Sequence, residues 1–351
     1  MSDFSALIQR LREGNSLSDG EIARAVQLLA APEDTADTKA EFLTALTAKG
    51  ETAAETAAFA RELRERSIRV PIDAETRQRV ILDVCGTGGD RLNTFNISTA
   101  VALVCAGAGI TVAKHGNRAI TSTSGSADVL EALGIPVELA PADAAESLRT
   151  HNFAFFFAPK YHPAFQHIGP ARKLCAERGQ RTIFNIMGPL LNPARPGVQL
   201  VGVPRPQFCE PVAQVLRQLG LRGAMVVCGQ AGEAFLDELS TIGPSTTASF
   251  HAGGEVSGAT LMPAVLGIPM AELGDLRGGD KFANAEIIRA ILEGRDRGPK
   301  RDAVLLNAAA AFHIAGLAET LPDAYKQAAQ TIDTGAAAYK LETLARSKAS
   351  L

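Results

Sequence analysis

The residues best suited to chemistry begin directly after a short apolar run, residues 80–84, which is typical of a buried parallel strand. Residues 86–90 read GTGGD, and a helix is predicted to begin near Ser98 and Thr99. Glycine lets the backbone approach a ligand closely, and the N-terminal end of a helix favours an anion. The stretch therefore predicts a phosphate-binding loop. It matches neither GxxxxGK[ST] nor GxGxxG, however, and a tight turn alone would also explain its glycines.

A second polar loop follows the next apolar run, residues 110–113, and begins KHGNR. It places two cations and an imidazole, Lys114, Arg118 and His115, beside the amide of Asn117. Residues 121–126 then add hydroxyl and backbone donors suited to phosphate oxygens. Because ligands of open α/β sheets bind outside the carboxyl ends of the strands, these loops favour a binding site over a solvated surface.

Residues 1–68, which precede these loops, are predicted to be purely helical. Three S/T-x-x-E boxes each predict a helix start: Ser18 with Glu21, Thr38 with Glu41, and Thr52 with Glu55. Gly50 is expected to end a helix. Such a bundle, expected to be joined by helices near residues 170–182, carries no chemistry of its own. It would form a dimer interface, a wall of the active cleft or simple packing.

The second domain is predicted to span residues 79–351, after a linker at residues 69–79. Short β-branched runs alternate with helical patterns there, which predicts an α/β domain with a mostly parallel central sheet. Predicted strands include residues 153–159, 183–187, 198–203 and 224–228, and residues 208–219 are a predicted helix. The predicted fold class is therefore α/β, with a small all-helical N-terminal domain and a large α/β domain.

Composition excludes several other classes of protein. The formal net charge is −3 and no Lys/Arg block occurs, which argues against a nucleic-acid surface. The longest apolar stretch, residues 99–113, is too short and too interrupted by glycine to span a bilayer, and no signal segment opens the chain. We therefore expect a cytoplasmic protein with no membrane partner. The 5 cysteines are widely spaced within apolar runs, which predicts buried thiols rather than disulfides or zinc ligands.

The order of these motifs resembles that of the anthranilate phosphoribosyltransferase family. GTGGD, NxST, KHGNR and SGSAD appear in the family's order, followed by FAPKYHPAF, RTIFNIMGPLLNP, LDELST and RDAVLLNAAAAF. The resemblance covers essentially the whole chain. It implies Mg²⁺-dependent transfer of a phosphoribosyl group from phosphoribosyl pyrophosphate (PRPP) to the amino nitrogen of anthranilate, with release of pyrophosphate. It also implies a homodimer formed through the helical domain.

The resemblance implies a role for individual residues of this chain. For PRPP they are Gly86, Gly89, Asp90, Thr94, Asn96, Ser98, Thr99, Lys114, Asn117, Ser122 and Ser126. For anthranilate they are Gly86, Asn117 and Arg172, the last interpreted as lying at the start of a helix. For Mg²⁺ they are Ser98, Asp237 and Glu238.

Elementary chemistry supports several of these roles. A guanidinium fork matches the two oxygens of a carboxylate, and Mg²⁺ needs only one or two carboxylates because it keeps several waters. A neighbouring acid pair such as Asp237 and Glu238 otherwise marks an exposed turn. Lys114 and the loop amides are expected to stabilise the departing pyrophosphate, while Asn117 and Arg172 position the acceptor. His115 would either accept the amine proton or act as a structural partner.

Two departures from the family pattern and three alternatives stay open. Thr123 stands where the family usually has a basic residue, and residues 174–181 form a longer connection than usual. The first is expected to weaken or reshape phosphate binding, and the second to alter the acceptor pocket or its lid. The alternatives are transfer to another aromatic amine, a pyrimidine-nucleoside phosphorylase, and a non-catalytic relative that binds nucleic acid. The phosphorylase lacks the carboxylate pair and KHGNR, and the non-catalytic relative predicts a lost glycine loop and a basic face.

Overall fold

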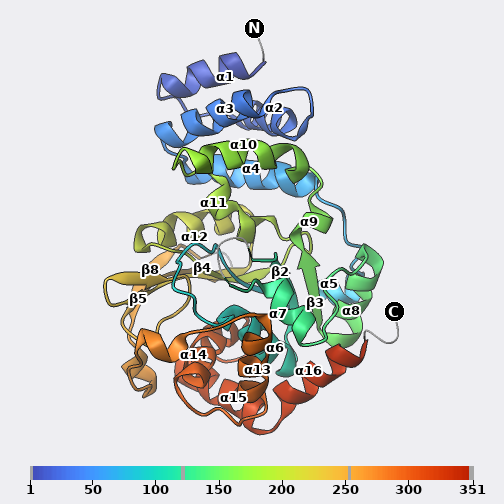
Figure 1. The fold of residues 1–351 in the computed structure, drawn as a ribbon, viewed down its shortest axis with the longest axis vertical. Helices are drawn as coiled ribbons and strands as arrows, with labels where there is room; N and C mark the ends of the chain where they lie inside the picture. Colours follow the sequence, from blue (N-terminus) through green and yellow to red (C-terminus); the bar gives the residue numbers. More distant parts are fainter. Residues whose placement is uncertain (1–2, 120–122, 252–253, 348–351) are drawn as a thin grey trace.

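The computed structural model describes residues 3–119, 123–251 and 254–347 and confirms the predicted fold class. A helical bundle lies at one end of the molecule, above an α/β domain built on one sheet (Figure 1). The bundle contains α1 (Asp3–Arg12), α2 (Asp19–Ala30), α3 (Ala36–Lys49) and α4 (Ala53–Glu65). The much later helix α10 (Phe165–Glu177) packs against α2 and α3.

The bundle helices begin largely where their caps predict. Both the Ser18–Glu21 and the Thr52–Glu55 pairs form complete capping boxes. The box predicted at Thr38 is wrong, because α3 begins earlier and is capped by Thr35, whose Oγ1 accepts a hydrogen bond from the Thr38 N–H at 3.2 Å. Gly50 follows α3 with φ +86°, so the predicted helix end is confirmed.

The segment between the bundle and the sheet is not a plain linker. It contains the short helix α5 (Ala74–Gln78). Asp73 caps this helix, accepting hydrogen bonds from the Thr76 N–H at 2.9 Å and its hydroxyl at 2.7 Å. The prediction of a linker overlooked this N-cap, which supplies the local stabilisation that a short helix needs.

The central sheet has eight strands in the order β3-β2-β1-β4-β5-β7-β8, with β6 paired to β5. The strands are β1 (Ile81–Gly86), β2 (Thr111–Gly116), β3 (Phe153–Phe157), β4 (Val198–Gly202), β5 (Gly223–Ala231), β6 (Ala234–Leu236), β7 (Ser245–Phe250) and β8 (Ser257–Leu261). The neighbouring strands β3, β2, β1, β4 and β5 are parallel, whereas β6, β7 and β8 pair antiparallel. All carboxyl ends of the parallel strands therefore open at one edge.

Side chains alternate between two cores on opposite faces of this sheet. Leu200 of β4 and Val227 of β5 face a core formed with α6 (Ile97–Gly107) and α14 (Pro299–Ile314). Val201 and Val226 face a second core that is continuous with the helical bundle through α12 (Cys209–Gln218). One sheet thus anchors both ends of the molecule.

The remaining helices surround the sheet, with α13 to α16 on the side away from the bundle (Figure 1). They are α7 (Ser126–Ala132), α8 (Pro141–His151), α9 (Ala158–Tyr161), α11 (Phe184–Met187), α13 (Lys281–Leu292), α15 (Leu321–Asp333) and α16 (Ala336–Ser347). Short 3₁₀ helices occupy Gly188–Leu191, Pro206–Phe208, Pro263–Leu266 and Leu273–Leu276. No helix in the described part of the chain is long and apolar enough to cross a membrane.

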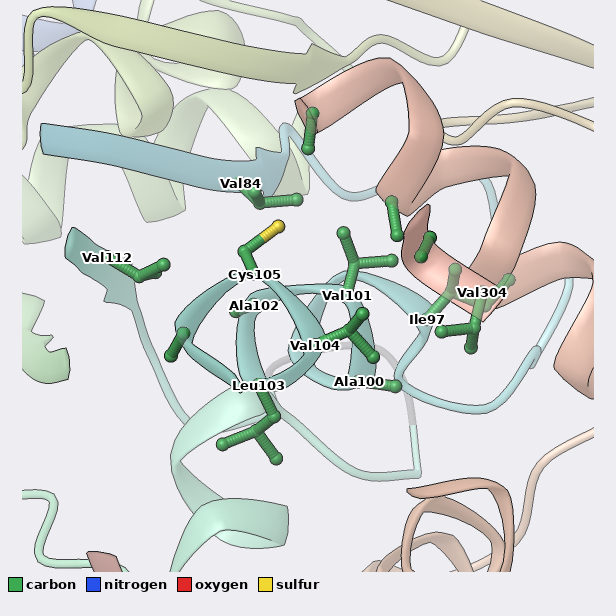
Figure 2. Close-up of a cluster of buried hydrophobic side chains, with 14 of the residues drawn as sticks. Val84, Ile97, Ala100, Val101, Ala102, Leu103, Val104, Cys105, Val112 and Val304 are labelled. Atoms are coloured by element: carbon green, nitrogen blue, oxygen red, sulfur yellow. The ribbon is translucent and has the colours of Figure 1, made fainter. Parts of the chain in front are cut away.

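Helix α6 forms the centre of the larger core. Val84 of β1, Val112 of β2 and Val304 of α14 surround it in Figure 2. A helix that is apolar on all sides is stable only when it is buried on all sides. Because the segment that follows the glycine loop ends at the start of α6, this packing fixes the end of that segment.

Most of the predicted α/β elements are confirmed, with one exception. Residues 198–203 and 224–228 fall on β4 and β5, and residues 208–219 on α12. Residues 183–187 were predicted as a strand but form α11. Ile183, Phe184 and Met187 are buried while Asn185 is exposed, which is helical spacing rather than alternation. The predicted buried thiols are also confirmed, since all five cysteines are free and buried.

The buried capping box should stabilise the bundle far more than its exposed counterpart. Glu55 accepts hydrogen bonds from the N–H groups of Leu17 and Thr52, and it pairs with Lys49 at 2.6 Å, with both side chains at most 5% exposed. We expect Glu55→Ala to reduce the free energy of unfolding by about 3 kcal/mol, because Lys49 is left buried and unpaired. Glu21→Ala, the control at the exposed box, should cost less than about 1 kcal/mol. Urea denaturation of both variants checks this, and equal losses would contradict it.

Candidate active site

The site forms where residues 236–240 cross the carboxyl ends of three neighbouring strands. Three glycines make this crossing possible: Gly86 of β1, Gly202 of β4 and Gly229 of β5. A Cβ at Gly86 would lie 2.7 Å from Cγ of Asp237, one at Gly202 would overlap the backbone of Asp237, and one at Gly229 would lie 2.5 Å from the carbonyl oxygen of Glu238. The absence of side chains at these strand ends therefore lets the acid pair lie directly on the sheet.

Hydrogen bonds hold the acid pair against the first glycine loop. The Gly88 N–H donates to Oδ2 of Asp237 at 2.7 Å, and the Ser98 N–H donates to Oε1 of Glu238 at 3.1 Å. On the far side, Asn307 of α14 bonds both backbone groups of Leu239, at 2.9 and 3.0 Å. The Gly88 N–H is thus satisfied by a carboxylate rather than left free for phosphate. Glu238 occupies the positive N-terminal end of α6.

Lys114 completes this cluster from the neighbouring strand. Strand β2 continues to Gly116, so Lys114 and His115 lie on the strand itself rather than in the loop after it, and their side chains point to opposite faces. Lys114 is only 1% exposed, and its Nζ donates to the Val84 carbonyl at 2.7 Å and to the Ser98 hydroxyl at 3.3 Å. An ammonium has three N–H donors, so one remains for a ligand.

The interpretation of the acid pair as an exposed turn is wrong. Glu238 is buried and Asp237 is partly buried. Burial and the nearby charge of Asp90 raise the pKa of Asp237 to about 7, and burial together with Asp237 raises the pKa of Glu238 well above its usual value. Burial also lowers the pKa of Lys114, an effect opposed by the charge of Asp83. The site around Lys114 therefore holds more carboxylates than cations.

This donor set fits a hard divalent cation. Asp237, Glu238 and the Ser98 hydroxyl supply oxygen donors beside the glycine loop, and burial raises the pKa of both carboxyl groups. No cluster of three or more His, Cys, Asp or Glu side chains with metal-site geometry occurs among the residues that the structure describes. Mg²⁺ does not need one, because it keeps waters and shares oxygens with phosphates.

On the opposite face of β2, His115 pairs with His162. His115 Nδ1 lies 3.1 Å from the Gly188 carbonyl, and the two Nε2 atoms lie 3.2 Å apart. Burial lowers the pKa of His115 to about 3 and that of His162 to about 4, so both rings are neutral at neutral pH. When Nδ1 of His115 donates to the carbonyl, its Nε2 accepts from His162. Both nitrogens are thus engaged, which favours a structural partner over a general base.

Arg172 lies in the middle of α10, not at the start of a helix as predicted. Its guanidinium carbon lies 5.7 Å from the ring centre of Phe165 and 5.4 Å from that of Phe184. The rings of His162 and Phe165 are 5.9 Å apart, so aromatic contacts run from the histidine pair to the arginine. Within the described ranges the guanidinium forms neither a hydrogen bond nor an ion pair, and burial lowers its pKa. It is therefore free to pair with a planar carboxylate.

The other predicted residues lie on the loops after β1 and β2. Gly89 adopts φ +91°, and burial raises the pKa of Asp90. Asn117 accepts a hydrogen bond from the Arg118 N–H at 2.7 Å, whereas Arg118 itself pairs with Asp128 and acidic neighbours. Further predicted residues are Thr94 and Asn96 before α6, Thr99 in its first turn and Ser126 at the start of α7. Ser122 lies outside the described residues.

The sequence patterns did not predict a role for two further groups of residues near the site. The first is a fully buried carboxylate, Asp83 on β1, which accepts hydrogen bonds from Asn192 at 2.9 Å and Gln199 at 3.3 Å. An acidic residue inside an apolar strand run was the available signal. The second is the segment 276–284, whose backbone pairs with residues 93–95. The two glycines before a helix cap in this segment were its signal.

The two departures from the family pattern lie away from the acid pair. The Thr123 hydroxyl donates to the Gly279 carbonyl at 2.9 Å and so joins the loop after β2 to the segment 276–284. Residues 174–181 extend α10 and contact α3: Arg178 pairs with Asp37 at 3.1 Å, and Gln180 bonds Thr44 at 2.9 Å. The longer connection therefore packs on the bundle.

Comparison with known proteins decides the family. Residues 78–338 match the a/b domain of a glycosyl transferase family, and residues 5–67 match its helical bundle domain. An anthranilate phosphoribosyltransferase from Moorella thermoacetica is 47% identical over 97% of both chains. The chain belongs to the anthranilate phosphoribosyltransferase family. The resemblance drawn from its motifs is thus confirmed.

Solved structures of this family share the whole fold. The anthranilate phosphoribosyltransferase from Thermus thermophilus superposes with a TM-score of 0.87 at 37% identity, covering 97% of this chain and 98% of its own. The Saccharomyces cerevisiae family member, solved in complex with PRPP and Mg, has a TM-score of 0.87 at 27% identity and coverages of 99% and 98%. The same yeast protein has also been solved with 4-fluoroanthranilate.

The raised pKa of Asp237 predicts a pH-dependent stability difference. The usual value is 3.8 and the folded value about 7, so the folded protein holds a proton that the unfolded chain releases within this range. That contribution is complete below the unfolded pKa and is lost as pH rises through the folded pKa. Without metal, Asp237→Asn should therefore gain melting temperature relative to the parent as pH rises from about 5 to about 8. The lowered histidine pKa values act in both proteins and cancel.

Thermal unfolding in a chelator, measured at several pH values, checks this difference. Glu233→Gln, which removes one exposed carboxylate from the neighbouring turn, is the control for a change in net charge. Parallel curves for the parent and Asp237→Asn would contradict the raised pKa.

Proposed function

We propose that this protein transfers the phosphoribosyl group of PRPP to the amine of anthranilate, giving N-(5-phosphoribosyl)anthranilate and pyrophosphate. The observation that carries the proposal is the pairing of two complementary sites along β2. On one face, Lys114 and buried carboxylates surround the glycine loop; on the other, an aromatic path leads to the free guanidinium of Arg172. Family membership supports the same reaction.

We assign PRPP to the loops after β1 and β2. Lys114 would donate its remaining N–H to the pyrophosphate, and the hydroxyls of Thr94 and Ser126 and the amide of Asn96 would contact phosphate oxygens. The assigned residues also include Gly86, Gly89, Asp90, Ser98, Thr99, Asn117 and Ser122. Thr123 is neutral and its hydroxyl bonds Gly279, so this position of the loop after β2 supplies no positive charge to these phosphates.

Asp237, Glu238 and Ser98 would hold Mg²⁺. When bound, Mg²⁺ supplies positive charge to the pyrophosphate oxygens as they leave. Support comes from the buried carboxylates with raised pKa values and from the yeast family member solved with PRPP and Mg. A bound cation would let both carboxyl groups ionise.

Arg172 and Asn117 would hold anthranilate. The guanidinium pairs with the ortho-carboxylate, and Phe165 and Phe184 provide apolar surface for the aromatic ring. The yeast family member solved with 4-fluoroanthranilate supports an aromatic acid as acceptor. In this arrangement the amine would point towards the ribose carbon of PRPP, beyond the carboxyl end of β2.

In the reaction the bond from ribose C1 to the pyrophosphate oxygen breaks, a bond from C1 to nitrogen forms, and the amine proton passes to solvent. Lys114 stabilises charge where it develops, on the leaving group. His115 is a poor acceptor for the proton because its pKa is about 3. Positioning therefore contributes more than general-base catalysis.

Larger-scale features belong to the same proposal. Residues 1–68 together with α10 would form the helical domain and the rest of residues 79–351 the catalytic domain, as the packing of α10 on α2 and α3 supports. Two copies would associate through this bundle, which matches the family's helical bundle domain. The five free, buried thiols agree with a reducing, cytoplasmic location.

The proposed acceptor is tested by offering anthranilate, aniline, and thymidine with phosphate to the purified protein. With PRPP and Mg²⁺, we expect loss of anthranilate fluorescence with matching pyrophosphate release. Aniline should react at least about 100-fold less efficiently, because it leaves the guanidinium unpaired. Arg172→Ala should raise the KM for anthranilate about tenfold or more without an equal change for PRPP. Lys173→Ala, at the exposed neighbouring position, is the control.

Each other outcome points to a different function. Pyrophosphate release with another aromatic amine alone would contradict the named acceptor. Phosphorolysis of thymidine would contradict the reaction class. Absence of turnover together with nucleic-acid binding at physiological salt would favour a non-catalytic protein.

A further inference from the structure

The segment 276–284 contacts both of the proposed phosphate-binding loops. The Phe95 N–H donates to the Leu276 carbonyl at 3.1 Å, and the Gly278 N–H donates to the Asn93 carbonyl at 2.9 Å. Thr94 lies opposite Arg277 in this short antiparallel bridge. The segment therefore lies directly against the loop that leads into α6.

Asn284 connects the segment 276–284 to the first loop directly and to the second loop through Asn96. It lies in the first turn of α13, which Asp280 caps, and it is 1% exposed. Its Nδ2 donates to Oδ1 of Asn96 at 2.9 Å, and Asn96 in turn donates from Nδ2 to the Ser124 carbonyl at 3.1 Å. A chain of side-chain amides thus runs from α13 through the first loop to the second.

Backbone groups fix which atom of each side-chain amide donates and which accepts. The Gly279 N–H donates to Oδ1 of Asn284 at 2.8 Å, and a backbone N–H can only donate. Asn284 must therefore present its NH₂ group to Asn96, which must present its oxygen in return. This leaves the NH₂ group of Asn96 facing the second loop, where one N–H bonds Ser124 and the other remains for a ligand oxygen.

We propose that Asn284 is a positioning residue for PRPP, acting through Asn96. The inference rests on the proposed function, because it takes the free N–H of Asn96 as a contact for a phosphate oxygen. Without Asn284, the Asn96 side chain keeps only its bond to the Ser124 carbonyl and can rotate about it, so its free N–H no longer points steadily at the phosphate. The first loop also loses its side-chain connection to α13, while the bond from Asn96 to Ser124 remains. Asn284 itself is enclosed by protein and touches no substrate.

The test combines kinetics with a double-mutant cycle. Asn284→Ala should raise the KM for PRPP about tenfold, while kcat and the KM for anthranilate change by less than about twofold. In an Asn96→Ala background the same substitution should add less than about twofold, because the group it positions is gone. The rise in melting temperature caused by PRPP with Mg²⁺ should shrink in parallel.

Asp280→Ala is the matched control for local destabilisation. Asp280 accepts hydrogen bonds from the Phe282 and Ala283 N–H groups, so its removal loosens the same helix end without touching Asn96. A similar rise in the KM for PRPP in Asp280→Ala, additive effects in the cycle, or an equal rise in the KM for anthranilate would each overturn the inference. Wild-type turnover in the same assay is measured first. Its absence would overturn the proposed function and, with it, this role.

Discussion

The carboxyl ends of β1, β4 and β5 carry glycine at the three positions where residues 236–240 lie on the sheet. A side chain at Gly86 or Gly202 would occupy the space of Asp237, so the acid pair reaches the first glycine loop only because these strands end without side chains. The Gly88 hydrogen bond to Asp237 and the bond from Ser98 to Glu238 both follow from this approach. Packing of α6 on the core then holds the loop in place. The charges of the site can therefore come together only because three backbone positions carry no side chain.

The resulting charge distribution is unfavourable for the isolated protein. Burial raises the pKa values of Asp237, Glu238 and Asp83 and lowers that of Lys114, while Arg172 lies between two rings without a counter-ion among the described residues. Asp83 is hydrogen-bonded within the protein by Asn192 and Gln199. In the proposed reaction a divalent cation would satisfy Asp237 and Glu238, pyrophosphate would satisfy the lysine, and a carboxylate would satisfy the arginine. Desolvated and unpaired charges give strong discrimination, because a ligand that lacks the complementary group leaves them unpaired. The site is therefore costly to the fold and selective towards its substrates.

The sequence predicted the fold class, the loops and the family because those signals are local. Glycine runs, helix caps and alternating apolar runs act within a few residues. Burial of the acid pair was not predictable, since it depends on glycines of three distant strands. Residues 183–187 have the composition of a strand, yet packing against the bundle makes them a helix. Asn284 was missed because its partner Asn96 lies 188 residues away. The position of Arg172 within α10 depends likewise on the extension of that helix along the bundle.

Binding of PRPP to a Gly86→Ala variant tests whether the glycine at the end of β1 places Asp237 in the site. The added Cβ would lie 2.7 Å from Cγ of Asp237 and displace its carboxylate, whereas Gly20→Ala, at an open position in α2, is a control with nothing within 4 Å of the added atom. Calorimetric titration with and without Mg²⁺ measures how far the metal strengthens PRPP binding. We expect the gain in PRPP affinity caused by Mg²⁺ to be at least about tenfold smaller in Gly86→Ala than in the parent, and unchanged in Gly20→Ala. An unchanged gain in a folded Gly86→Ala protein would contradict the claim that this glycine places Asp237 in the site.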